Sequence, residues 1–80
     1  MSAKDAVVGR FQQLCKKRNI KINELATLSG VTPSTVYSLM DPRRREVSIT
    51  TIKKLCDGLE ITLIEFFDTP EFKALEQEIQ

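Results

Sequence analysis

The sequence predicts an all-α fold. Its apolar residues recur three and four positions apart over most of the 80 residues, which is the spacing of one helix face. Ser, Thr, Pro and Gly separate these runs at points where helices commonly begin and end. No segment alternates apolar and polar residues as a half-buried strand does. We therefore expect a small bundle of five helices followed by a short C-terminal helix.

Composition limits the class of protein. A hydrophobic content of 41% with 29% charged residues is typical of a globular chain. No apolar run approaches the ~20 residues of a membrane span, and no secretion signal is recognisable, so a cytoplasmic protein is expected. Cys15 and Cys56 each lie in a helical apolar run, which indicates reduced core thiols rather than a disulfide. Without histidine, neither a zinc site nor another cofactor is expected.

The charge is distributed unevenly along the chain. Residues 1–54 hold 11 Lys/Arg against 4 Asp/Glu, a balance of +7, whereas residues 55–80 hold one Lys against 7 acids, a balance of −6. The two parts give the overall charge of +1. This asymmetry predicts one pole that meets a polyanion and another that avoids it.

The first helix is expected from about Lys4 to Arg18. Five apolar residues form one continuous face of it: Val7, Val8, Phe11, Leu14 and Cys15. The basic residues 16–18 occupy its last turn, where cations complement the helix dipole. They form either a solvated helix end or a phosphate-facing cluster, and both interpretations stay open. Residues 19–21 form a linker.

Two short helices with a sharp turn follow, over residues 22–29 and 33–40. Gly30 is expected to end the first, because glycine tolerates the positive φ of a helix C-cap. Val31 fills the corner. Thr32 is expected to cap free backbone N–H groups of the second helix, and Pro33 suits its first position.

The second of these helices has two distinct faces. Its apolar residues point inward, together with two of the preceding helix: Leu25, Ala26, Val36, Leu39 and Met40. Ser34, Tyr37 and Ser38 fall on the outward face. Two helices joined by a glycine turn, the second with a polar outer face, form the helix-turn-helix pattern.

A basic loop follows this pattern. Asp41-Pro42 ends the helix, because the residue before proline disfavours helical backbone. Arg43, Arg44 and Arg45 come next, where a loop can lie along a DNA backbone and guanidinium groups can bind phosphate oxygens. We expect at least one of the three to contact phosphate.

Three further helices are predicted. Ser48 is expected to cap a helix that ends near Gly58 and carries the apolar stripe Ile49, Ile52, Leu55, Cys56 and Leu59, with Lys53 and Lys54 facing solvent. Ile61 packs the following corner, and residues 62–65 have the form of a capping box that opens a short helix with Phe66 and Phe67. Thr69-Pro70 begins the last helix, residues 70–80, with Phe72, Leu75 and Ile79 on one face.

These elements resemble the Cro/CI-type helix-turn-helix proteins, which include phage repressors and small bacterial transcriptional regulators. The resemblance covers residues 7–68, and its motifs are Phe11-x-x-Leu14, Glu24-Leu25-Ala26, Ser29-Gly30-Val31, Val36-x-x-Leu39, Ile49-x-x-Ile52-x-x-Leu55 and Leu59-x-Ile61-Thr62 before Phe66-Phe67. It implies a five-helix bundle that binds double-stranded DNA, usually as a homodimer, with the helix over residues 33–40 in the major groove.

The resemblance also assigns contact residues. Pro33, Ser34 and Ser38 match positions that face bases, and Tyr37 lies beside them. The phosphate-facing set is Ile22, Asn23, Thr32 and Thr35, together with Arg43, Arg44 and Arg45. The base-facing positions lack the long amide or guanidinium side chains common in the family, so direct readout is expected to be weak relative to phosphate contacts and DNA shape.

A second departure from the family lies in the core. Many members pair an arginine late in the first helix with a glutamate at the end of the third, and the matching residues here are Cys15 and Met40. Replacing both partners by apolar groups avoids a stranded buried charge. We therefore expect Cys15 and Met40 to pack against each other.

Three classes of function follow from these observations. The first is a DNA-binding transcriptional regulator, with residues 1–68 as the DNA-binding domain and residues 69–80 packing on the bundle or at a dimer interface. The alternative is a protein-interaction module, such as an antitoxin or adaptor, which the acidic C-terminal part and its aromatic residues favour. An enzyme has little support, because no histidine, paired nucleophile and base, or phosphate-binding glycine loop is present.

Overall fold

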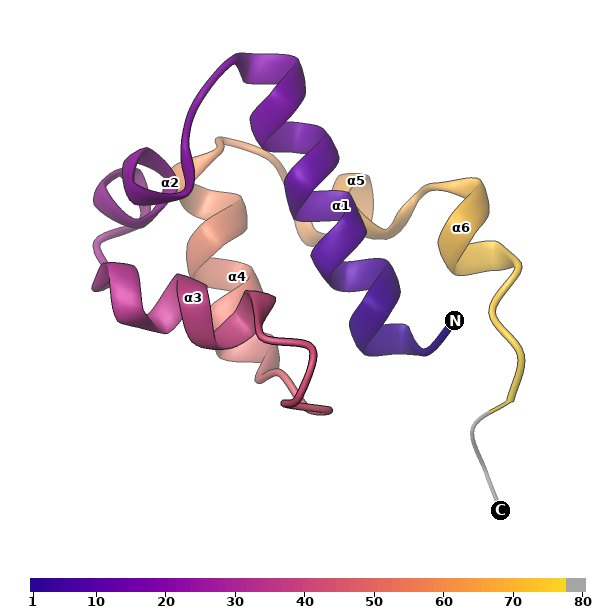
Figure 1. Ribbon diagram of the computed structural model, residues 1–80. Helices are drawn as coiled ribbons and strands as arrows, with labels where there is room; N and C mark the ends of the chain where they lie inside the picture. Colours follow the sequence, from indigo (N-terminus) through magenta and orange to yellow (C-terminus); the bar gives the residue numbers. More distant parts are fainter. Residues whose placement is uncertain (78–80) are drawn as a thin grey trace.

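The structure, a computed structural model that describes residues 1–77, is built from helices (Figure 1). They are α1 (Ala3–Arg18), α2 (Ile22–Ser29), α3 (Pro33–Met40), α4 (Ile49–Gly58), α5 (Leu63–Phe67) and α6 (Pro70–Lys73). No strand occurs within these 77 residues, in agreement with the all-α prediction. No described helix is long and apolar enough to cross a membrane.

Local signals explain where most helices begin and end. Ser2 caps α1 in a reciprocal capping box with Asp5, and Asn19 ends it in left-handed conformation with φ of 54°. The hydroxyl of Ser48 accepts a hydrogen bond from the Thr51 backbone N–H, which confirms the predicted cap of α4. A capping box over residues 62–65 opens α5, also as expected.

The turn between α2 and α3 is made by Gly30, which has a φ of 68° and is the C-cap of α2. Thr32 occupies the N-cap position of α3, but the expected side-chain cap is wrong, because no backbone N–H donates to its hydroxyl. That hydroxyl lies 2.9 Å from the Ser34 hydroxyl and 3.0 Å from the Thr35 hydroxyl. The Thr32 hydroxyl is thus bonded to neighbouring hydroxyls rather than to a backbone N–H.

One apolar core joins the first five helices. It consists of Val7, Phe11, Leu14, Cys15, Leu25, Ala26, Val36, Leu39, Ile52, Leu55, Cys56, Leu59 and Phe66. Both cysteines are buried and free, and Met40 is half-buried against the same cluster. Ile49 was expected in this core but is 58% exposed. It is the first residue of α4, and the core on this helix begins one turn later, at Ile52.

The central helix of the bundle is α2, which packs most extensively on α4 and α3. Gly58 lies at the closest approach of α4 to α2. A Cβ atom added there would lie 2.9 Å from the Cα and N atoms of Ser29. Glycine is therefore required at residue 58 for helix packing rather than for a turn.

The C-terminal part is less helical than expected. The predicted helix over residues 70–80 is wrong in length, because α6 ends at Lys73 after a single turn and residues 75–77 have no regular structure. Short helices are marginal without tertiary contacts. Phe72 supplies such contacts here, with its ring centroid 4.9 Å from that of Phe67 and 5.8 Å from that of Phe66. The Thr69 hydroxyl does not cap α6. Ile79 lies outside the described residues.

Candidate nucleic-acid interface

The outer face of α3 carries the predicted base-facing residues together. Pro33, Ser34 and Tyr37 are exposed and Ser38 is half-buried. On the opposite side, Val36 and Leu39 are buried in the core. The structure therefore presents the predicted polar face outward, while the opposite side of α3 packs into the bundle.

A hydrogen bond links this face to α2. The hydroxyl of Tyr37, which is 55% exposed, donates to Oδ1 of Asn23 over 3.0 Å. Asn23 was predicted to face phosphate, so the bond brings a base-facing and a phosphate-facing residue together. It also holds the Tyr37 hydroxyl at the start of α2.

The remaining phosphate-facing residues near this helix differ in what they can offer. The Ile22 side chain is half-buried and packs against the core, so only its backbone can face a phosphate. Backbone N–H groups in the first turn of a helix have no intrahelical acceptor and favour anions. Thr32 and Thr35 join Ser34 in a cluster of hydroxyl groups at the start of α3.

The arginine loop is exposed, but its side chains are not equally available. The Arg43 guanidinium binds both carboxylate oxygens of Asp41, at 3.0 and 3.1 Å. These hydrogen bonds lower the pKa of Asp41 to about 2 and raise that of Arg43. Arg45 donates to the Ser2 hydroxyl over 3.0 Å and lies 3.9 Å from the Asp5 carboxylate.

Arg44 differs from its neighbours. Within residues 1–77 its guanidinium makes no hydrogen bond or ion pair, whereas its backbone is bonded on both sides. Its N–H donates to the Asp41 carbonyl over 3.1 Å, and its own carbonyl accepts from the Lys4 ammonium. The Arg44 side chain is thus free on a fixed backbone.

Lys4 is a functional candidate that sequence reasoning missed. It is only 5% exposed, and its Nζ donates to the backbone carbonyls of Arg44 and, over 3.2 Å, of Asp41. A buried ammonium satisfied by two carbonyls fixes the loop to α1. The sequence did hold a signal that Lys4 is buried: it lies three residues before Val7 and therefore on the apolar face of α1.

A groove of about 280 Å³ joins the loop to the outer face of α3. Its lining consists of Thr35, Ser38, Leu39, Arg44, Glu46, Val47, Ser48 and Thr51. Three of the predicted contact residues therefore share one groove with an acidic side chain, Glu46.

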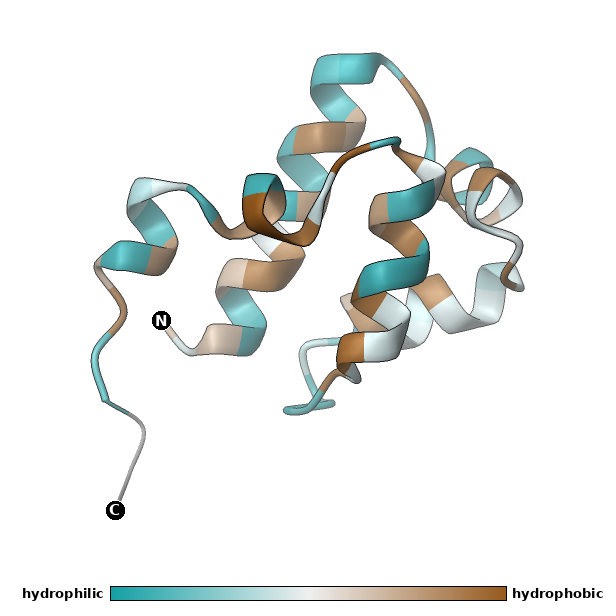
Figure 2. Cartoon of the chain, turned by 180° about the vertical axis from the view of Figure 1, so that it is seen from behind, coloured by the Kyte–Doolittle hydropathy of each residue, from teal (hydrophilic) through white to brown (hydrophobic). Residues whose placement is uncertain are grey.

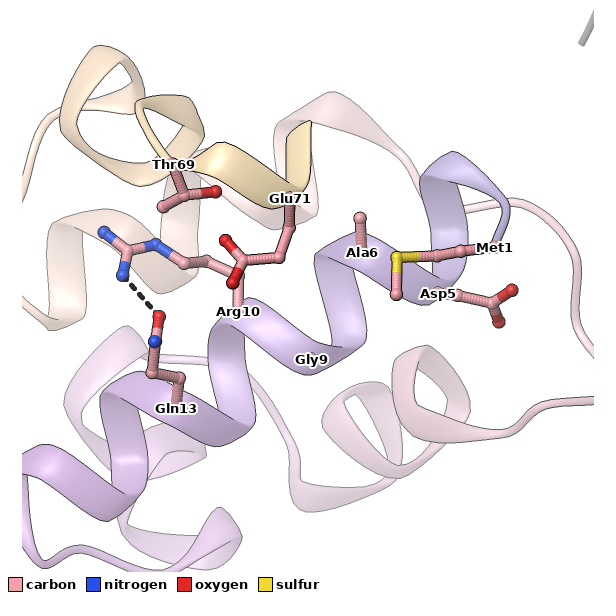
Figure 3. A pocket seen from close by; sticks show the side chains of 8 residues that line it. All are labelled: Met1, Asp5, Ala6, Gly9, Arg10, Gln13, Thr69 and Glu71. Atoms are coloured by element: carbon pink, nitrogen blue, oxygen red, sulfur yellow. Dashed lines mark hydrogen bonds between the residues drawn. The ribbon is translucent and has the colours of Figure 1, made fainter. Parts of the chain in front are cut away.

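A separate hollow lies between α1 and α6, and Figure 3 shows its eight lining residues: Met1, Asp5, Ala6, Gly9, Arg10, Gln13, Thr69 and Glu71. The Arg10 guanidinium is already occupied by the Gln13 side chain and the carbonyls of Glu65 and Phe66. None of the predicted DNA-contacting residues lines this hollow.

The described part of the chain contains neither a cluster of metal ligands nor a reactive thiol. No group of three or more His, Cys, Asp and Glu side chains gathers there in a way that could hold a metal ion. Burial raises the pKa of the Cys15 thiol, and it raises that of Cys56 to about 11. Both thiols therefore stay protonated and weakly nucleophilic near neutral pH.

The chain is also similar to known proteins. Residues 10–71 match a family model described as a Cro/C1-type HTH DNA-binding domain. The chain is also similar to the crystal structure of the prophage Lp1 protein 11, with 34% sequence identity and a TM-score of 0.82. That similarity covers 94% of this chain and 100% of the other. No curated protein matches the chain.

Proposed function

Because this chain belongs to the Cro/C1-type helix-turn-helix DNA-binding family, we propose that it is a small prokaryotic or phage transcriptional regulator that binds double-stranded DNA with sequence preference. The family consists of DNA-binding regulators rather than enzymes. The proposal places the protein in the cytoplasm, where its DNA lies. The single observation that carries it is the exposed polar face of α3, which is continuous with α2 through the bond between Tyr37 and Asn23.

In the proposed complex, α3 enters the major groove with Pro33, Ser34, Tyr37 and Ser38 toward the bases. The start of α2 lies across the backbone, where Ile22 offers its N–H and Asn23 its amide. Thr32 and Thr35 approach phosphates from the start of α3. This arrangement is supported by the docking geometry that helix-turn-helix proteins share.

The loop supplies the main positive charge to this face. Arg43, Arg44 and Arg45 are proposed to contact phosphates on DNA, and all three are exposed. Arg43 and Arg45 would exchange exposed intrachain bonds for DNA contacts. Such surface ion pairs contribute at most about 1 kcal/mol, so they are weak competitors for phosphate.

We further propose that residues 1–68 form the DNA-binding domain, that residues 69–80 cover the bundle, and that the protein acts as a homodimer. Figure 2 shows an apolar region at α5 and the corner before it. Ile64 there is 81% exposed, and it borders a hollow shared with Ile61 and Leu63. An exposed apolar patch of this kind supports a protein contact, whereas Phe72 of α6 is engaged with its own bundle.

Salt-dependent binding tests the proposal. Fluorescence anisotropy on random genomic duplex DNA gives the binding constant at successive salt concentrations. The logarithm of this constant should fall by about 0.9 per phosphate contact for each tenfold rise in salt concentration. The triple variant Arg43→Ala/Arg44→Ala/Arg45→Ala should reduce this slope, because up to three phosphate contacts are lost. The control variant Lys53→Ala/Lys73→Ala removes exposed positive charge outside the proposed face and should leave the slope unchanged.

A protein-interaction module remains the second candidate, and the exposed Ile64 beside the acidic C-terminal part favours it. The same titration separates the two functions. A complete lack of binding to genomic DNA at low salt would refute the regulator and leave the interaction module. Retained binding with an unaltered salt slope in the triple arginine variant would refute the phosphate role of the loop.

A further inference from the structure

The outer face of α3 has little capacity to discriminate bases by itself. Ser34 and Ser38 carry hydroxyl groups, which donate or accept and therefore fit several bases. The Tyr37 hydroxyl is already bonded to Asn23. If the protein prefers a sequence through base contacts, a longer side chain close to α3 has to supply much of the discrimination.

Arg44 is placed to do this. It lines the same groove as Thr35 and Ser38, so its side chain is next to the base-facing part of α3. Unlike Arg43 and Arg45, it has no intrachain partner for its guanidinium within the described residues. A free guanidinium fork matches the O6 and N7 acceptors of guanine in the major groove.

The backbone that carries Arg44 is held in place. Lys4 is buried, and its ammonium donates to the carbonyl of Arg44 itself. The N–H of Arg44 donates to the carbonyl of Asp41. A side chain that starts from a fixed backbone loses less freedom when it binds a base, which favours specific contact over a loose phosphate contact.

Glu46 gives an independent indication. It is an exposed carboxylate in the same groove, within the most basic loop of the chain, and it makes no ion pair with Arg44 or with any other cation among residues 1–77. A carboxylate there is repelled by phosphates, so it does not serve backbone binding. In the major groove it can accept from the N4 amino group of cytosine or the N6 amino group of adenine, and of these the cytosine amino group lies in the same base pair as a guanine that Arg44 can bind.

We infer that Arg44 and Glu46 together read one G·C base pair, Arg44 at guanine and Glu46 at cytosine, at the edge of the site contacted by α3. This inference rests on the proposed DNA-binding function and deepens it. It changes the role of Arg44 from a phosphate contact to a base contact.

Selection of bound duplexes from a random pool tests the inference, with wild type, Arg44→Lys, Glu46→Gln and the control Glu76→Gln, which makes the same change at an exposed residue outside the proposed interface. The wild type should select a G·C pair. Arg44→Lys keeps the charge but replaces the planar fork by a single ammonium, so its discrimination at that pair should fall by about 5-fold. Glu46→Gln should weaken preference at the same pair, and Glu76→Gln should leave it unchanged. The melting temperature of each variant establishes that it is folded.

The outcomes separate this inference from the proposed function. If the wild type does not bind duplex DNA at any salt concentration, the proposed function fails, and the inference fails with it. If the wild type binds, but Arg44→Lys and Glu46→Gln select the same sequences with the same discrimination, only the inference is overturned. A wild type that binds without selecting any base pair also overturns it and leaves DNA binding intact.

Discussion

Among residues 1–77, three adopt left-handed backbone conformation, and they tolerate it to different degrees. Gly30 and Asn19 are the residue types that most readily accept positive φ. Glu60, with φ of 58°, does not belong to this group. Its N–H donates to the Asp57 carbonyl over 3.1 Å in the corner that follows α4. The corner therefore holds a strained residue that its sequence does not favour.

Glu60→Gly should stabilise the protein. Removing Cβ relieves a left-handed strain of about 1–2 kcal/mol, and the extra freedom of glycine in the unfolded chain offsets part of it, which leaves a gain of about 0.5–1 kcal/mol. Urea denaturation gives the free energy of unfolding. The matched control is Glu60→Ala, which removes the charge but keeps Cβ. Equal effects of both substitutions would show that the backbone is not the cause.

The expected contact between Cys15 and Met40 remains a prediction at the same scale. Cys15 is buried in the core and Met40 is half-buried against it. If they touch, Cys15→Ala and Met40→Ala should be non-additive by about 0.5 kcal/mol or more in a double-mutant cycle on the free energy of unfolding. Cys15→Ala combined with Ile64→Ala, at an exposed residue, serves as the additive control. Additivity of the first pair would mean that the two side chains do not pack together.

At the scale of helices, the sequence predicts most helix bounds well, because these depend on neighbouring residues. The bounds of α2 and α3 agree with expectation because Gly30 and Pro33 act locally. The predicted length of α6 and the predicted burial of Ile49 were wrong, because each depends on contacts with helices that are distant in the sequence.

In the candidate site, too, the sequence predicts the features that depend on neighbouring residues but not those that depend on the fold. Helical spacing alone predicts the outward face of α3. Spacing does not predict which arginine side chain is free. Arg45 is bonded to Ser2, and the backbone carbonyls of the loop accept hydrogen bonds from Lys4. These partners lie about forty positions away in the sequence, and only the fold brings them together.

The close approach of α4 to α2 gives a paired prediction for glycine. Gly58→Ala should destabilise the protein by roughly 1–3 kcal/mol, because the new methyl group would overlap the backbone of Ser29. Gly9→Ala in α1 has open space around the added Cβ and should stabilise by about 0.5–1 kcal/mol through helix propensity. Thermal denaturation of both variants measures the contrast. Stabilisation by both would show that α2 and α4 can separate at little cost.

At the scale of the whole molecule, the contacts of α1 fix the candidate interface to the rest of the bundle. The start of α1 contacts the loop after α3 through Lys4 and Arg45. In the middle of the same helix, Arg10 joins α1 to α5 through the carbonyls of Glu65 and Phe66. The longest helix thus connects the basic loop to the acidic C-terminal part, and it holds the two oppositely charged poles in a fixed relation.

Acid stability provides a test that draws on charges across the whole molecule. Hydrogen bonds from Ser2 lower the pKa of Asp5, and those from Thr62 lower the pKa of Glu65. Bonds from Arg43 lower the pKa of Asp41 to about 2. Each carboxylate binds its proton less tightly in the folded state than in the unfolded state. Their contribution is therefore complete above the ordinary carboxyl pKa and is lost as the pH falls.

We expect the free energy of unfolding to decline as the pH falls from about 4 to about 2, the window between the ordinary carboxyl pKa and that of folded Asp41. Asp41→Asn should make this decline shallower, because one group with different folded and unfolded pKa values is removed. Glu76→Gln makes the same change in charge at an exposed residue and serves as the control. Urea denaturation at successive pH values measures the slope. Identical slopes in wild type and Asp41→Asn would mean that the bond between Asp41 and Arg43 does not persist in solution, and Arg43 would then be as free for DNA as Arg44.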